Sequence, residues 1–137
     1  MKGHKVNIER ATKKNNLFRQ VLYTAKNMQL VLMSLKPGED IGEEVHKNDQ
    51  FFRFEEGKGK VLIDGNEHEV SDGDSVIVPA GARHNVINQS KTDHLKMYTI
   101  YAPPHHKDQT IHKTKEVAEK SEEEFDGVTT EHVVMSK

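Results

Sequence analysis

Apolar and polar residues alternate in short stretches along the middle of the chain, and turn residues separate these stretches. Such alternation is typical of β-strands, because successive side chains of a strand point to opposite faces. Strands are predicted over residues 17–24, 28–35, 41–46, 50–55, 60–63, 67–70, 75–78, 84–88 and 95–101. Between two of them, Asp64 followed by Gly65 is a strong signal for a tight hairpin. Strands that recur about every eight to twelve residues with Gly-rich turns predict an all-β sandwich or barrel.

The two ends of the chain differ in composition from the middle. Residues 1–16 are polar and basic, and within them residues 8–14 could form a short helix. Residues 113–124 are charged and contain no Pro or Gly, so a solvated helix with a weak apolar face could form there. Residues 121–137 are expected to be loose. The predicted organisation is an N-terminal arm (1–16), one β-barrel domain (17–104) and a polar C-terminal tail (105–137) that includes the candidate helix.

Two spaced motifs lie within residues 37–88 and contain the candidate chemistry. The first places Glu44, His46 and Gln50 between two glycines, and the second carries one further histidine, His84. Glu44 and His46 are two residues apart, so on a strand they point the same way. If another strand brings His84 opposite them, four polar side chains converge. Imidazole nitrogens with carboxylate and amide oxygens are ligands that suit divalent transition-metal ions.

In these motifs the chain resembles the cupin superfamily. The second cupin motif is matched at every fixed position, namely Gly73, Pro79, Gly81, His84 and Asn88. The first is matched at Gly38, His46 and Gly57, and it departs from the family at two ligand positions. There Glu44 replaces the usual histidine, and Gln50 replaces the usual glutamate.

The resemblance implies a double-stranded β-helix (a jelly-roll barrel) with Glu44, His46, Gln50 and His84 as metal ligands. The implied cofactor is a divalent ion, Zn, Mn, Fe, Ni, Co or Cu. Four ligands leave two positions of a six-coordinate ion open to water or a small molecule. The simpler alternative is a cupin barrel without metal, in which these four side chains are only hydrogen-bonded. Residues 103–115 look like the tail of small bacterial cupins called mannose-6-phosphate isomerase-like.

Other residues have a possible role in the site and a simpler interpretation. His105, His106 and His112 could cap the cavity or bind a metal, but a solvated loop after the barrel is the simpler expectation. Arg53, Arg83 and Lys96 could hold an anionic substrate, although isolated cations are more often solvated. For Phe52, Phe54, Met33 and Tyr98, core packing is favoured over lining the mouth of a pocket. The glycines and Pro79 are interpreted as turn residues, and Asn88 as a side chain bonded to backbone.

The composition of the 137-residue chain restricts its partners. Its net charge of −2 gives no electrostatic basis for binding nucleic acid or a membrane surface. It contains no cysteine, which excludes disulfides and thiolate sites. There is no apolar run of membrane-spanning length and no apolar signal segment after residues 1–5, so we expect a cytoplasmic protein that binds a small molecule. Only 34% of the residues are apolar. This lean core and the family resemblance predict a homodimer, in which residues 17–24 add to a partner's sheet.

Three classes of function fit these observations. A metal-dependent enzyme, for example an isomerase or a dioxygenase, would use Glu44 as its candidate catalytic residue. A non-catalytic module would hold a small ligand, with or without a metal. A metal-free epimerase would need a histidine base paired with an aspartate, and the sequence identifies no such pair. The predicted function is to bind a divalent metal ion, as a cupin, and whether the protein is also an enzyme is left open.

Overall fold

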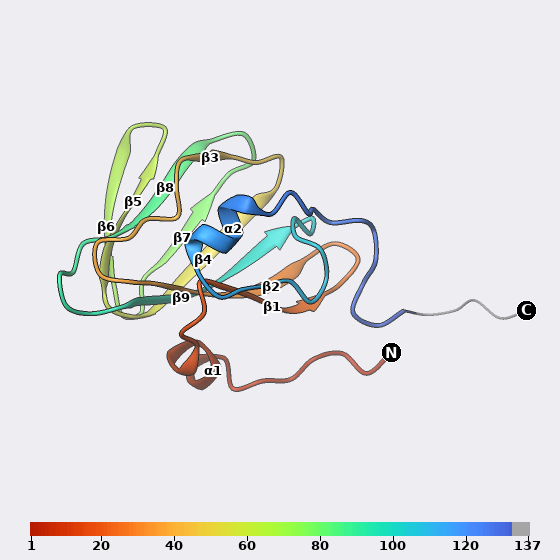
Figure 1. Cartoon of the computed structure of the whole chain (residues 1–137). Helices are drawn as coiled ribbons and strands as arrows, with labels where there is room; N and C mark the ends of the chain where they lie inside the picture. The colour runs from red at the N-terminus through yellow and green to blue at the C-terminus, as the bar shows by residue number, and fades with distance from the viewer. Residues whose placement is uncertain (133–137) are drawn as a thin grey trace, which may run out of the picture.

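The structure is a computed structural model that describes residues 1–132. Its strands form two antiparallel sheets that face each other (Figure 1), a six-stranded sheet in the order β10-β1-β2-β9-β4-β7 and a four-stranded sheet in the order β3-β8-β5-β6. The strands are β1 Arg19–Thr24, β2 Gln29–Leu35, β3 Glu44–Val45, β4 Asp49–Glu56, β5 Lys58–Ile63, β6 Asn66–Ser71, β7 Ser75–Val78, β8 Arg83–Asn88, β9 Leu95–Ala102 and β10 Ile111–His112. This architecture confirms the predicted all-β double-stranded β-helix.

The turns lie where glycine and hairpin signals predict them. Asp64 and Gly65 both have positive φ, 46° and 82°, and they join β5 to β6 with Ile63 opposite Asn66. Two-residue hairpin turns favour this conformation because its twist matches that of the flanking strands. Gly57 combines a φ of 103° with a close approach, since an added Cβ would lie 2.5 Å from the His94 carbonyl oxygen. Only glycine fits this position without strain.

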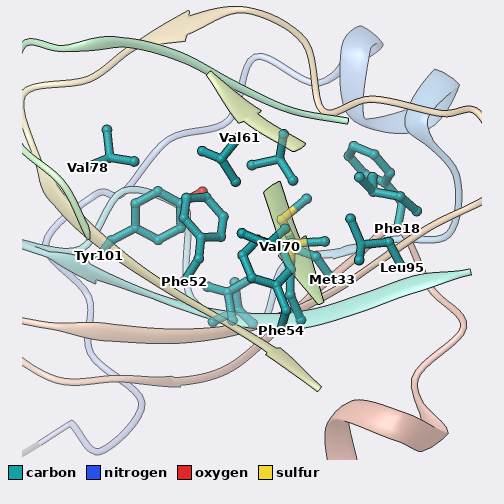
Figure 2. Packing of buried hydrophobic residues seen from close by; sticks show 14 of the residues in the cluster. Phe18, Met33, Phe52, Phe54, Val61, Val70, Val78, Leu95 and Tyr101 are labelled. Atoms are coloured by element: carbon teal, nitrogen blue, oxygen red, sulfur yellow. The ribbon is translucent and has the colours of Figure 1, made fainter. Parts of the chain in front are cut away.

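An apolar core fills most of the space between the sheets. Figure 2 shows Tyr101 beside Phe52 at one end of this core and Phe18 near Leu95 at the other. Phe52, Phe54 and Met33 are at most 1% exposed, which confirms that they pack in the core. Tyr98 is only half-buried and lies beside Phe51. The core therefore leaves the polar residues at the Tyr101 end to form a site.

Helix α1, Ile8–Lys14, lies in the N-terminal arm and begins where the Asn7 side chain accepts a hydrogen bond from the Arg10 amide. Helix α2, Lys115–Lys120, is shorter than the predicted range of 113–124 and begins at Thr114, whose hydroxyl accepts a bond from the Val117 amide. Such caps satisfy amide groups that the first helical turn leaves unpaired. Within residues 1–132, no helix is long and apolar enough to cross a membrane.

The C-terminal tail is bonded to the barrel over much of its length. Strand β10 pairs with β1, so that His112 lies opposite Arg19. Further along, the Thr130 amide donates to the Thr24 carbonyl at 2.9 Å. The expectation that residues 121–137 are loose is therefore wrong as far as residue 132, because backbone groups of β1 supply partners for the tail. Residues 133–137 lie outside the described part of the chain.

These contacts also affect the predicted route to a dimer. Strand β1 has β2 on one side and β10 on the other, and beyond β10 its Val21 amide donates to the Thr110 carbonyl. The edge that residues 17–24 would offer to a partner's sheet is thus occupied by the chain itself. The dimer stays a prediction, but this route to it would require the tail to leave β1.

Candidate metal centre

The pairing of β3 with β8 brings the two motifs together. In this register Glu44 lies directly opposite His84, and His46 follows β3 immediately. One ligand atom from each of Glu44, His46 and His84 can be chosen so that all three lie within 4.8 Å of one another. Three of the four predicted ligands therefore converge at one point, as the alternation of side chains along a strand requires.

The second motif also orients its histidine. The Nδ1 atom of His84 lies 3.0 Å from the Ala82 carbonyl oxygen. Because a carbonyl oxygen can only accept, Nδ1 carries the proton and Nε2 keeps its lone pair. A backbone partner of this kind is what fixes the tautomer of a metal-binding histidine. His84 is 4% exposed, so this orientation is held inside the barrel.

The first motif leaves its histidine without a conventional partner. The Nε2 atom of His46 is buried and has no hydrogen-bond partner among residues 1–132, although Glu44 Oε2 lies 3.5 Å away. The rings of His46 and His84 have centroids 5.2 Å apart. A buried nitrogen that lacks a partner is costly unless something else binds it. A metal ion held by both imidazoles would remove this cost.

The fourth predicted ligand shows the same pattern. Gln50 lies on β4, and its Nε2 donates to the Thr99 hydroxyl at 3.0 Å. Its Oε1 is buried and unpartnered in the described part of the chain. Gln50 pairs with Tyr101, whose ring lies 5.9 Å from that of His46, so it belongs to the same end of the barrel. The free carbonyl oxygen is the atom that could bind a metal, and the donor set therefore fits a divalent ion.

The electrostatics of the centre keep Glu44 ionised. Burial by itself raises the pKa of this carboxyl, but the His46 imidazole 3.5 Å away and the positive charge of Arg19 act against burial, so that its pKa is lowered. A carboxylate is the form that binds metals, and it is the only anionic group in the predicted ligand set.

The histidines of the tail enter the site, which corrects the expectation of a solvated loop. The His105 ring lies 4.2 Å from the His46 ring and stacks on Tyr101 at 5.2 Å, measured between centroids. His106 is 7% exposed, and its Nε2 lies 3.2 Å from the Tyr101 hydroxyl. The cause is a buried amide: Gln29 Oε1 accepts from the backbone amides of His105 and His106, at 3.2 and 3.0 Å.

Burial keeps His105, His106 and the adjacent Tyr101 of β9 uncharged. It lowers the pKa of His105 to about 4, with the charge of His46 acting in the same direction and that of Glu44 opposing it. It also lowers the pKa of His106 and raises that of the Tyr101 phenol to about 12. At neutral pH all three are therefore neutral groups that can exchange hydrogen bonds without adding charge to the site.

Arg19 is the residue of the site that the sequence analysis missed. It is 6% exposed and lines a cavity of about 170 Å³ together with Glu44, His105, His106 and His112. Its Nη1 lies 3.1 Å from His112 Nδ1. The sequence contained one signal for it. Arg19 lies in a predicted strand two residues before Val21, so its side chain points to the same inward face as that of Val21.

The cations considered from the sequence do not line this cavity. Arg53 pairs with Glu55 at 3.2 Å, and Arg83 pairs with Glu43 at 2.9 Å. Lys96 is buried rather than solvated, because its ammonium group donates to the Lys13 carbonyl at the end of α1. These three residues therefore stabilise the barrel and its arm, and none of them lines the cavity beside Glu44.

Comparison with known proteins places these features in a family. Residues 31–101 match the family model described as a cupin domain. The chain is 51% identical over 117 residues to the uncharacterized protein YrkC of Bacillus subtilis, matching 80% of this chain and 62% of YrkC. It is 47% identical over 105 residues to the uncharacterized protein L612 of Acanthamoeba polyphaga mimivirus, matching 74% of this chain and 66% of L612. The chain thus spans less than two thirds of the length of either curated relative.

A solved structure gives the same result. The crystal structure of BH2720 from Bacillus halodurans is 44% identical in sequence, with a TM-score of 0.84, and the match covers 86% of this chain and 94% of that one. The matched residues include all four candidate ligands, Glu44, His46 and Gln50 in the first motif and His84 in the second. With both motifs, the two-sheet barrel and this family match in agreement, the chain belongs to the cupin superfamily.

Proposed function

We propose that the protein binds a divalent transition-metal ion through Glu44, His46, Gln50 and His84, and that this centre binds or acts on a small molecule in the neighbouring cavity. The observation that supports it best is the pair of buried, unpartnered atoms His46 Nε2 and Gln50 Oε1, two of the four side chains that the motifs predict as ligands. Unpartnered buried polar atoms are rare in folded proteins, and a bound ion would explain both.

The chemistry of the pocket follows from its own residues and the ion. When bound, a divalent ion would act as a Lewis acid that polarises a carbonyl or activates water. Glu44 is the candidate catalytic residue, because its carboxylate is ionised and lines the cavity, where it can accept a proton. The Tyr101 phenol remains protonated and can donate. Isomerase-like activity stays a prediction.

Metal analysis of the purified protein tests the proposal. We expect about one equivalent of a divalent ion per chain after reconstitution, and loss of most of it in His84→Ala. His68→Ala is the matched control, since His68 is exposed on β6. Equal metal content in the two variants, or no ion in protein dialysed against Mn, Fe, Co, Ni, Cu and Zn salts in turn, would contradict it.

Enzyme status is a separate test on the same protein. A small molecule that raises the melting temperature of the metal-loaded protein, and is recovered unchanged after long incubation, favours a binding module. A molecule that is converted, with turnover lost in both His46→Ala and His84→Ala, favours a metal-dependent enzyme.

A further inference from the structure

Arg19 carries a buried positive charge that no acidic side chain neutralises by contact. Within residues 1–132 its guanidinium makes no ion pair within 4.0 Å, although its charge acts on the nearby Glu44, and its Nε has no hydrogen-bond partner there. Its contacts in the described chain include His112, the Tyr101 hydroxyl and the ring face of Phe18, 5.2 Å from the guanidinium carbon. A buried guanidinium without a carboxylate partner destabilises the fold, so we interpret such a group as one that binds an anion.

The cavity beside Arg19 is large enough for a small anion. Its volume of about 170 Å³ holds roughly five or six water molecules, at about 30 Å³ each. Among the described residues, Arg19 is the one Lys or Arg that lines it. One guanidinium is the usual partner of one carboxylate, because its donors match the two oxygens.

The proposed metal centre strengthens this argument. Glu44 lines the same cavity as Arg19. A divalent ion would leave this end of the barrel with an excess of two positive charges after Glu44 and Arg19 are counted. Glu122, Glu123 and Glu124 also line the cavity, but all three are exposed, and Glu123 is paired with Lys107 at 3.1 Å. Solvent screens such exposed charges much more than it screens the buried guanidinium.

We propose that this cavity is a carboxylate-binding subsite, in which Arg19 binds one carboxylate of a small organic acid while the rest of the molecule faces Glu44 and the metal centre. Only the contact with Glu44 and the metal centre rests on the proposed function; the contact with Arg19 does not. Arg19 is the specificity-determining residue: it selects an anionic ligand over a neutral molecule of the same shape.

Titration calorimetry with malonate, malonamide and inorganic phosphate tests the proposal on metal-loaded and on EDTA-treated protein. We expect malonate to bind at least about tenfold more tightly than its neutral amide, since a bond to a charged group contributes about that much. Arg19→Gln should weaken malonate binding about ten- to a hundredfold, whereas Arg53→Gln should leave it unchanged, because Arg53 is paired with Glu55 away from the cavity. Phosphate should bind more weakly than malonate.

A measurement on the wild-type protein covers the case in which Arg19→Gln does not fold. The NMR signal of the Arg19 Nε–H group should shift on addition of malonate and stay in place on addition of malonamide, and the Arg53 signal should not move. An unmoved Arg19 signal, equal affinity for malonamide, or a folded Arg19→Gln variant with wild-type malonate affinity would each overturn the subsite. Tighter binding of phosphate would overturn the choice of a carboxylate.

The two proposals can fail separately. If no metal binds but EDTA-treated protein still takes malonate in an Arg19-dependent way, the metal centre fails and the subsite stands. If an ion binds through His46 and His84 and malonate binding is absent from both forms of the protein, the subsite fails and the metal centre stands.

Discussion

His105 from the C-terminal tail lies against His46 from the first motif, with ring centroids 4.2 Å apart. The tail therefore completes the wall of the site. Gln29 holds the tail there, because its Nε2 also donates to the His106 carbonyl at 2.7 Å. In Figure 1 the chain that follows β9 passes back along the barrel to α2, and β10 lies between these two elements in the sequence. The site thus depends on how the tail docks as well as on the two motifs.

Gln50→Glu is expected to increase metal affinity. The substitution replaces a neutral carbonyl ligand by a carboxylate, and Thr99 can donate its hydroxyl proton to the new group. The dissociation constant should fall by about tenfold or more, measured by competition with a chelator of known affinity. Gln89→Glu, which adds the same charge at an exposed position, is the control. Equal affinities of the two variants would remove Gln50 from the ligand set.

Asn88→Ala is expected to destabilise the fold strongly. The Asn88 amide is 1% exposed and donates to the carbonyls of Leu35, Lys36 and Asp93, at 3.1, 3.0 and 2.8 Å. This confirms that it bonds backbone. Its loss leaves one buried and two partly buried carbonyls without this partner, at a cost of about 2–4 kcal/mol. Urea unfolding measures the change.

Asn66→Ala is the matched control for Asn88→Ala, because the exposed Asn66 amide makes one bond, to the Ile63 carbonyl. We expect an effect of about 0.5 kcal/mol or less from this surface substitution. Similar losses of stability in the two variants would mean that the Asn88 bonds are not important to the fold.

Asp40→Asn is expected to loosen α2 at neutral pH. Lys115 at the start of α2 donates to Asp40 at 2.6 Å, and this bond, followed by one from Asn85, lowers the pKa of Asp40. A lowered carboxyl pKa means that the contact stabilises the fold above the pKa of the unfolded chain, about 3.9, and is lost as pH falls through the lower value of the folded state. Because the pair is partly exposed, its contribution is about 1 kcal/mol or less.

Hydrogen exchange of the α2 amides detects this loosening. Asp40→Asn should exchange faster than wild type at pH 7, whereas Glu39→Gln, at an adjacent, partly exposed acid bonded to the Lys36 amide, should not. The Asp40→Asn difference should shrink as pH falls below the ordinary carboxyl range. A difference that persists unchanged at low pH would show that ionisation of Asp40 is not its cause.

Metal-free protein is expected to lose stability as pH falls from about 6.5 towards 4. Burial lowers the pKa values of His105 and His106, so the unfolded chain takes up protons in this range that the folded state does not. Each such histidine lowers the free energy of unfolding by up to about 1.4 kcal/mol per pH unit. His106→Gln should reduce the slope measured by urea unfolding, and His68→Gln should not. Identical slopes would contradict this assignment.

Much of the architecture follows from local patterns in the sequence. The positive φ values at Asp64 and Gly65 and the strand boundaries near Pro79 are set by residues next to each other in the chain. The candidate ligands of the first motif are also local in this sense, because the spacing of Glu44 and His46 fixes their common direction on a strand. The resemblance of both motifs to a known family then indicated which strand would supply His84.

Only the tertiary structure decided the rest of the site. Arg19 and the histidines at 105, 106 and 112 lie in segments whose local composition is that of an ordinary strand and a polar loop. Their burial follows from the pairing of β10 with β1 and from the Gln29 side chain, which donates to the His106 carbonyl and accepts from the His106 amide. These are contacts between residues far apart in sequence. Such contacts leave no periodic signal, because each is set by the geometry of the closed barrel and by the need to pair buried backbone groups.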